Sequence, residues 1–317
     1  MSHTNATAVP PAPPNFLQCA DKSNNSTPQR QKPQLEECLW SIDQPELQKA
    51  CFLARICTTR KPKSCTYYNI NSILQVGPTC GLTAVSMLLG GLLPPTVLLQ
   101  EAKERHYTYN GEMFSAHNLF QLICDYLPII NNNNNNNDDV TIDKNSRPCK
   151  LNANDTDSRN TATTTPAQIP QQQQRRQTAV HQRPIECQMH EGRLNCAKVR
   201  DALLQGACLF VPYDPDFNHS PCLKSGHKAH WALIIGHLIA DNDEFYVIAR
   251  HGKAKNLAVW SLQSLSDSNA NLIEFAQPKG YPDCDFLLPP GGIGGNLGLR
   301  ERAIIVKGLP LEITTIS

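Results

Sequence analysis

A long polar stretch in the middle of the chain most limits how this sequence can fold. Residues 131–184 include an asparagine run from Asn131 to Asn137, a threonine-rich patch and a run of glutamines. Such a composition buries too little apolar surface to offset the entropy that is lost on ordering. We therefore predict a disordered insertion at about 131–184, inside one domain that spans residues 35–310. Residues 1–34, rich in proline and small polar residues, are predicted to be a disordered tail.

The parts on either side of the insertion differ in their hydrophobic patterns. Residues 35–130 carry apolar residues at helical spacing, and the segment after Cys80 is apolar nearly all round, as in a buried helix. After the insertion, one helical segment precedes short apolar runs that predict strands. These runs are ACLFVPYD, HWALIIGHLI and EFYVIARH, and LAVWSLQSL and RAIIVKGL are further candidates for strands or short helices. Helices first and strands later predict an α+β domain, with N-terminal helices packed on an antiparallel sheet.

Charge and composition exclude several classes of function. The 317 residues include 29 Lys and Arg against 28 Asp and Glu, so no strong field attracts nucleic acid. No apolar run approaches the roughly 18 residues of a membrane span, and the first residues lack the apolar core of a secretory signal. Thirteen cysteines without the spacing of a disulfide framework are typical of a reducing compartment. We expect a cytoplasmic protein that binds neither nucleic acid nor membrane.

The segment QVGPTCG combines a reactive residue with the surroundings that would activate it. Gly77 and Pro78 interrupt any preceding element, which puts Cys80 in the first turn of the apolar helix. There the helix dipole favours a thiolate, and the free backbone N–H of Cys80 can donate to an oxyanion. The side-chain amide of Gln75 can supply a second donor. A buried packing cysteine is the alternative interpretation of this segment.

A histidine that begins a strand supplies the base for that thiol. His230 opens the apolar run HWALIIG, so it is expected at one end of the sheet, where an imidazole can reach a thiol across a cleft. A structural histidine is the alternative. Gln, then Cys-Gly, then a strand-start His followed by an aromatic residue is the chain order of papain-like cysteine peptidases, and we predict that fold.

Several longer segments resemble the actin maturation proteases, a cysteine-peptidase family related in pattern to the bacteriocin-processing peptidases. The segments are QVGPTCGLTAVSMLLGG, NGEMFSAHNLFQL, GHKAHWALIIGHL, EFYVIARHGKAKNLAVWSLQSL and PPGGIGGNLGLRERAIIV. The resemblance implies an aminopeptidase that removes the N-terminal, acetylated Met or Cys residue from immature actin without a cofactor. It implies Cys80 as nucleophile, His230 as base and Gln75 as oxyanion donor.

The resemblance leaves the residue that orients His230 open. Related peptidases carry an Asp or Asn on the next strand, where this chain has Arg250 and His251. His251, Asn256 or a backbone carbonyl can take the role.

The resemblance also implies that the proline-rich tail recruits profilin. The tail contains PPAPP, which favours an extended polyproline conformation. Its prolines are Pro10, Pro11, Pro13 and Pro14.

Cationic residues flank the base in the sequence and on the strand expected beside it. They are Lys224, His227, Lys228, Arg250, Lys253 and Lys255. If the two strands are neighbours, these residues form a rim that favours an acidic peptide. Ordinary solvated side chains in two loops are the alternative.

Three other functions remain open at this point. Two sets of residues are conceivable zinc ligands, although neither spacing matches a paired zinc signature: Cys222, His227 and His230, or Cys187, His190 and Cys196. An inactive adaptor that holds actin and profilin is a second alternative. A thiol acyltransferase is the third, since it uses the same Cys and His chemistry with an amine as acceptor.

Overall fold

The computed structural model describes residues 39–56, 60–133 and 184–316. The predicted tail at 1–34, with its PPAPP segment, and most of the predicted insertion at 131–184 lie outside the described residues, so both stay predictions. No helix among the described residues is long and apolar enough to span a membrane.

The helices lie mainly in the first half of the described chain, as the sequence predicted. A single 3-10 turn, η1, precedes them at Leu39–Ser41. The α-helices are α1 (Pro45–Leu53), α2 (Cys80–Leu88), α3 (Pro95–Glu104), α4 (Ala116–Tyr126), α5 (Pro128–Asn133), α6 (Ala197–Leu204) and α7 (Leu262–Ala270).

Most strands follow the insertion, and every pairing recorded between them is antiparallel. The strands are β1 (Ser64–Tyr68), β2 (Glu186–Glu191), β3 (Cys208–Pro215), β4 (Pro221–Cys222), β5 (His230–Ile239), β6 (Phe245–His251), β7 (Ala258–Ser261), β8 (Arg302–Lys307) and β9 (Ile313–Ile316). The main path through the sheet is β2-β8-β3-β5-β1-β9, and β6 joins β5 to β7. The predicted α+β class with an antiparallel sheet is confirmed.

Strand β5 is the centre of this sheet. Its first half pairs with β3, its second half pairs with β1, and β6 runs along it from Ala232 to Ile239. All but the last of its residues are buried. A strand held by three neighbours gives a histidine at its first position a fixed place in the fold.

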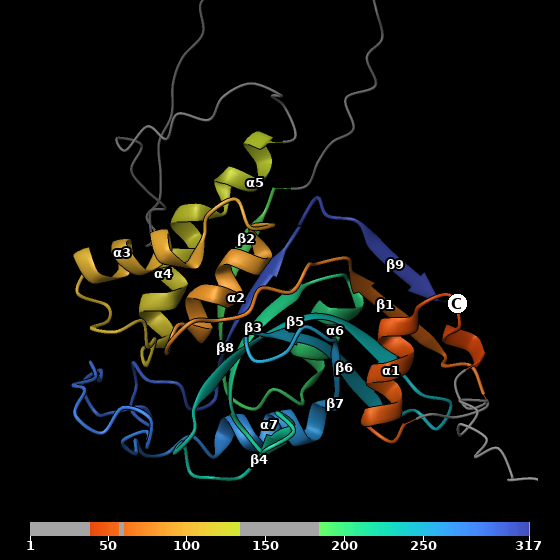
Figure 1. The fold of residues 1–317 in the computed structure, drawn as a ribbon. Coiled ribbons are helices and arrows are strands. Elements are labelled where there is room, and N and C mark those ends of the chain that lie inside the picture. The colour runs from red at the N-terminus through yellow and green to blue at the C-terminus, as the bar shows by residue number, and fades with distance from the viewer. Residues whose placement is uncertain (1–38, 57–59, 134–183, 317) are drawn as a thin grey trace, which may run out of the picture. The chain divides into compact units, whose positions relative to one another are not determined.

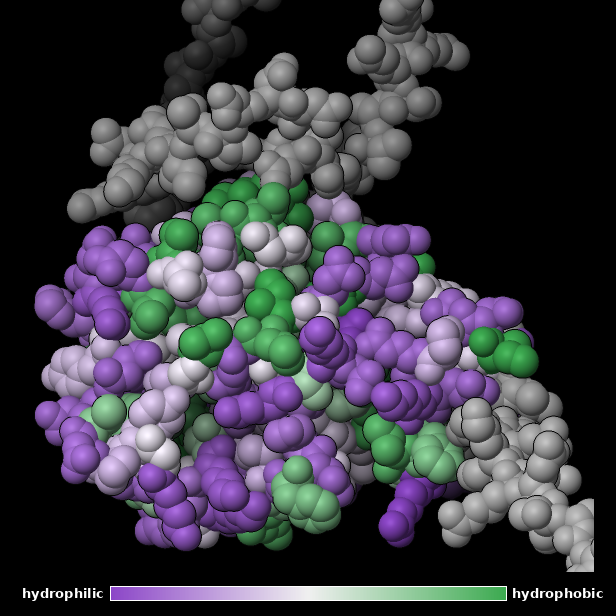
Figure 2. All heavy atoms as spheres, viewed as in Figure 1, coloured by the Kyte–Doolittle hydropathy of each residue, from purple (hydrophilic) through white to green (hydrophobic). Residues whose placement is uncertain are grey.

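Helices cover both faces of the sheet. Alternate residues of β5 enter two separate hydrophobic clusters, with Leu233 and Ile235 facing α2 and α4, and Ala232 and Ile234 facing α6 and α7. Figure 1 shows α2, α3 and α4 on one side of the strands and α7 on the other. The N-terminal helices therefore pack on the sheet as expected. On the surface drawn in Figure 2, hydrophobic residues form several small groups among hydrophilic ones.

Four strands were not predicted from the sequence, and the shortest of them, β4, pairs with β3. β1 lies in the part expected to be helical, where Cys65, Tyr67 and Tyr68 are buried against the core. β2 immediately follows the expected insertion and pairs with β8. β9 lies beyond residue 310, where we expected the domain to end, and it pairs with β1.

An ion pair ties the first helix to the strand beside β5. The guanidinium of Arg250 on β6 donates to both carboxylate oxygens of Glu46 on α1, and also to the carbonyl oxygens of Ile70 and Lys255 at 2.8 Å each. The Glu46 carboxylate also accepts the backbone N–H of Leu257 at 2.8 Å. Arg250 is only 7% exposed, so Glu46 compensates a charge that is almost entirely removed from water.

Replacing Glu46 with alanine should therefore destabilise the fold. We expect the free energy of unfolding to fall by about 2 kcal/mol, because a nearly buried guanidinium loses its charged acceptor. Urea denaturation measures the change. Glu104→Ala removes an exposed carboxylate of α3 and is the matched control, with an expected change within about 0.5 kcal/mol. Equal stability of the two variants would contradict a structural role for the pair.

Candidate active site

Cys80 is the first residue of α2, as the sequence predicted. The turn before it is closed by the Thr79 hydroxyl, which donates to the carbonyl oxygen of Val76 at 2.9 Å. The side chain of Cys80 is 8% exposed and lines a cavity of about 860 Å³. The helix behind it is buried on all sides. Its apolar sequence thus anchors the thiol at the edge of the cavity.

The start of α2 lies directly against the start of β5. A Cβ added to Gly81 would lie 3.1 Å from the ring of Trp231 and 3.2 Å from Met113, so glycine permits this close approach. The Trp231 indole N–H donates to the carbonyl oxygen of Met113 at 2.8 Å, which fixes the ring. The backbone N–H of Trp231 lies near enough to the Cys80 thiol to lower the pKa of that thiol. The thiol therefore lies beside the residue that follows His230.

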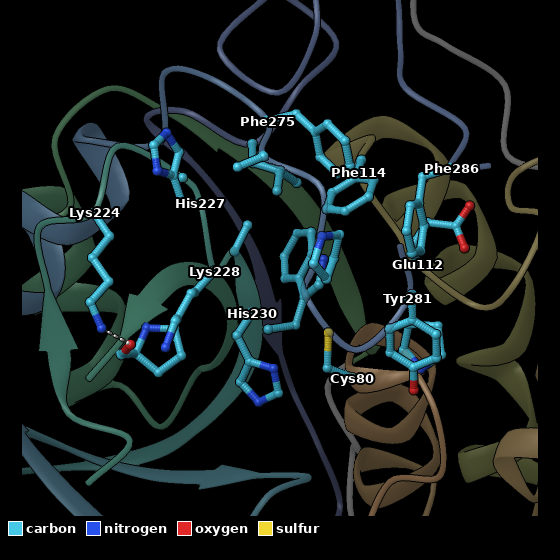
Figure 3. Close-up of a pocket in the computed structure, with 18 of the residues that line it drawn as sticks. Cys80, Glu112, Phe114, Lys224, His227, Lys228, His230, Phe275, Tyr281 and Phe286 are labelled. Carbon is cyan, nitrogen blue, oxygen red and sulfur yellow. Dashed lines mark hydrogen bonds between the residues drawn. The ribbon is translucent and has the colours of Figure 1, made fainter. Parts of the chain in front are cut away.

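His230 begins β5, as predicted, and lines the same cavity as Cys80. It is 4% exposed, and its Nε2 atom has no hydrogen-bond partner among the described residues. Its ring lies edge-on to Tyr213, with 5.9 Å between the ring centroids. Figure 3 draws His230, from β5, and Cys80, from α2, among the side chains that line this cavity.

Burial shifts the two pKa values in opposite directions. It raises the pKa of the Cys80 thiol, although the N–H groups of Trp231 and Gly81 and the charge of Lys253 partly oppose it. Burial, and then the neighbouring His251, Lys253 and His219, hold the pKa of His230 well below its usual range. The resting pair is thus a neutral thiol and a neutral imidazole. The thiolate expected from the helix dipole is not favoured, because burial outweighs the dipole.

Gln75 also lines this cavity, and its amide is held in place. Its side-chain Nε2 donates to the carbonyl oxygen of Gly77 at 2.7 Å. Its backbone N–H donates to the carbonyl oxygen of Gly252 at 2.9 Å. A Cβ on Gly252 would come within 2.9 Å of the Gln75 side chain, so glycine leaves room for it. An amide nitrogen has two protons, and one of them remains for a ligand.

A cluster of histidines lies behind His230. The ring centroid of His251 is 6.2 Å from that of His230 and 5.1 Å from that of His219, and the His251 ring stacks on Trp260. No hydrogen bond joins these imidazoles among the described contacts. Burial and the nearby cations lower the pKa of His251 to about 4. Of the two side chains considered as orienting residues, His251 is the one whose ring contacts His230, and neither of the two lines the cavity.

The structure brings only part of the expected cationic rim to the cavity. Lys228 and Lys253 are exposed at its wall, with Lys224 and His227 beside Lys228 (Figure 3). Arg250 does not reach the cavity, because it is buried in its ion pair with Glu46.

Lys255 is exposed but lies outside the cavity lining as well. Sequence order could not separate it from Lys253, since the two residues are neighbours in one loop. This difference makes the two lysines a natural pair for comparison.

A buried carboxylate that sequence analysis missed holds the loop before His230. Asp214, at the end of β3, is fully buried. Its two oxygens accept the backbone N–H groups of Lys224 at 3.2 Å, Gly226 at 2.7 Å and Lys228 at 2.9 Å. These bonds fix the loop that leads into β5. An acidic residue that ends an otherwise apolar strand was the only available signal.

The described part of the chain contains no site for the zinc ion that was considered as an alternative. No group of three or more His, Cys, Asp or Glu side chains there is arranged to hold an ion.

Comparison with known proteins gives consistent relatives. A family model described as "Actin maturation protease-like, C-terminal domain" matches residues 70–147 and 171–238. The actin maturation protease of Drosophila melanogaster is 48% identical over 278 residues, which cover 88% of this chain and 84% of that protein. That of Danio rerio is 27% identical over 267 residues, covering 72% of this chain and 70% of the relative. The actin maturation protease of Homo sapiens is 24% identical over 283 residues, which cover 75% of this chain and 64% of that protein.

The α+β fold, the cavity and these relatives define the protein as a peptidase. Within that class, the chain belongs to the actin maturation protease family. The resemblance drawn from the sequence is confirmed.

The neutral state of the resting pair can be tested by alkylation. We expect the rate at which iodoacetamide modifies Cys80 to be low at about pH 5 to 7 and to rise only as the pH passes the ordinary thiol pKa of about 8.5, because burial raises the pKa of this thiol. Peptide mass analysis follows the modification, and Cys80→Ala gives the background from the other cysteines. Fast alkylation with a plateau at acidic pH would instead indicate a thiolate–imidazolium pair.

Proposed function

We propose that this protein is a cysteine aminopeptidase that removes the N-terminal, acetylated Met or Cys residue from immature actin. One observation carries the proposal. Cys80 and His230 line one cavity, at the first residue of α2 and the first residue of β5. The names of the relatives support actin as the substrate.

The proposed reaction proceeds through an acyl-enzyme. His230 takes the proton of the Cys80 thiol as the sulfur attacks the scissile carbonyl carbon. The Gln75 amide and the backbone N–H of Cys80 donate to the oxyanion. The imidazolium then returns its proton to the leaving amine, which departs as the new N-terminus of actin. Water, deprotonated by His230, hydrolyses the thioester and releases the acetylated residue.

We propose that His251 positions the base instead of contacting the substrate. Its ring lies edge-on behind His230 and is itself stacked on Trp260. This packing supports a fixed orientation of the His230 ring without a hydrogen bond between the two.

The cellular location and a second binding partner are proposed from the sequence alone. We propose that the protein acts in the cytoplasm. We also propose that Pro10, Pro11, Pro13 and Pro14 bind profilin, which would bring profilin-bound actin to the enzyme. Support for both is the composition of the chain and the family resemblance.

Substitutions at Cys80 and Gln75 test the mechanism. Cys80→Ala should abolish cleavage of an acetylated actin N-terminal peptide, because no nucleophile remains. Gln75→Ala should lower kcat by about a hundredfold, because one oxyanion donor is lost. Mass spectrometry follows the product, and circular dichroism verifies that both variants fold.

Three results would contradict the proposal. A Gln75→Ala enzyme at full rate would show that the oxyanion donor lies elsewhere. An adaptor would affect actin equally with and without Cys80. A transferase would leave an adduct instead of a free acetylated residue.

Lys253, which lines the cavity, and Lys255, which does not, together test the role of positive charge at the cavity. We propose that Lys228 and Lys253 attract the acidic residues that follow the scissile bond. Lys253→Glu should lower kcat/KM for an acidic peptide by about tenfold at low salt, because attraction becomes repulsion at the cavity. Lys255→Glu makes the same change in net charge outside the cavity and should change it by less than about twofold. The difference should shrink as salt is added. Equal effects of the two variants would exclude a specific rim.

A further inference from the structure

Four aromatic side chains form one wall of the cavity, and the mechanism above does not use them. Phe114 precedes α4, and Phe275, Tyr281 and Phe286 lie in the segment between α7 and β8. The three phenylalanine rings contact one another, with centroid separations of 5.3, 5.9 and 6.1 Å, and the ring of Tyr281 lies 6.3 Å from that of Phe286. All four are partly exposed to the cavity. This aromatic wall is an apolar surface that is open to a ligand.

Hydrogen bonds from polar groups hold the wall in shape. The Glu112 carboxylate accepts the backbone N–H groups of Tyr109 at 3.0 Å, Asn110 at 2.8 Å and Leu287 at 3.0 Å. These bonds join the turn before Phe114 to the segment that carries Phe286. The Gln277 amide donates to the carbonyl oxygens of Tyr281 and Cys284 at 2.6 and 2.8 Å. The rings are therefore positioned before any ligand arrives.

The aromatic wall and the cations lie on opposite sides of the thiol. In Figure 3, Tyr281, Phe286 and Phe114 lie across Cys80 from His230, while Lys228 and Lys224 lie on the His230 side. None of the four rings is charged, and Lys279, between Phe275 and Tyr281 in the sequence, is an exposed cation that lines the cavity beside them. The carboxylate of Glu112, which lines the cavity beside the wall, already accepts three backbone N–H groups. One side thus suits an uncharged apolar group and the other an anionic one.

The position of the base decides which part of a peptide each side would bind. The imidazole that takes the thiol proton gives it to the leaving amine, so the leaving chain must lie on the His230 side. The acyl residue, which becomes bonded to sulfur, then lies on the opposite side. Chemistry and geometry together place the acyl residue against the aromatic wall and the leaving chain against the lysines.

We infer that Phe114, Phe275 and Phe286 form the subsite for the side chain of the residue that is removed, and that among the residues the enzyme removes this subsite favours a large, flexible apolar side chain such as methionine over a smaller one. The inference rests on the proposed peptidase function and adds its specificity. A thioether or alkyl chain packs favourably against ring edges and faces, and burying it removes apolar surface from water. A glycine or alanine in the same place would leave the rings exposed.

The test compares two acetylated peptides that differ only in their first residue. Both carry the same acidic residues after it, one begins with Met and the other with Ala. The wild-type enzyme should cleave the Met peptide with a kcat/KM about tenfold or more above that of the Ala peptide. Phe114→Ala and Phe275→Ala should each remove most of this preference, because they slow the Met peptide much more than the Ala peptide. Phe275→Leu, which keeps an apolar side chain, should restore part of it.

Controls separate this subsite from stability and from charge. Phe120→Ala removes a partly buried phenylalanine of α4 that does not line the cavity, and it should preserve the preference. Lys253→Glu should slow both peptides equally, since both carry the same acidic residues. Because the preference is a ratio within one variant, a loss of folded enzyme lowers both rates and does not change it.

The outcomes are distinct. A wall variant that slows both peptides equally, or one that keeps the wild-type preference, would overturn the subsite while the peptidase function stands. A wild-type enzyme that cleaves both peptides equally well would overturn it too. A wild-type enzyme that cleaves neither of them, nor actin itself, would refute the proposed function.

Discussion

The contact between the first turn of α2 and the first residues of β5 is the constraint on which the site depends. Gly81 allows the helix to approach Trp231, and the Trp231 indole is fixed by its hydrogen bond to Met113. Cys80 and His230 are the residues immediately before these two, so the same packing that closes the core brings thiol and imidazole to one cavity. A bulky side chain at position 81 would separate the two elements without altering either reactive group.

The electrostatics of the empty cavity favour the uncharged forms of Cys80 and His230. Burial opposes charge on both Cys80 and His230, and Lys253 opposes the imidazolium while favouring the thiolate. Proton transfer from sulfur to nitrogen therefore lacks a partner for the positive charge that forms on His230. An acidic peptide on the lysine side, as proposed, would supply negative charge there and favour the imidazolium. On this view the substrate completes the electrostatic arrangement that the empty cavity lacks.

Local patterns predicted the placement of Cys80 and His230, because a Gly-Pro break before an apolar helix and a histidine at the start of an apolar run are visible within a few residues. The strands β1, β2 and β9 were missed because each is short and gains its stability from partners far away in the chain, such as β8 for β2. Arg250 looked like a rim residue until its partner, Glu46, became visible more than two hundred positions earlier. Asp214 and His219 also could not be predicted from local patterns, because their contacts are made with residues that only the folded chain brings close to them.

The two sides of the cavity are parts of one bonded unit. Asp214 fixes the loop at 224–228, which carries the cations. In that loop the carbonyl oxygen of Ser225 accepts the backbone N–H groups of Ile273 and Glu274 at 3.1 and 2.9 Å, directly before Phe275. His227 also pairs with Glu274 at 2.7 Å. Because these contacts join the lysine side to the aromatic side, a shift of either loop displaces the other. The proposed selection of the removed residue and the proposed attraction of the acidic chain are therefore coupled through the loop at 224–228, which the buried Asp214 carboxylate holds in place.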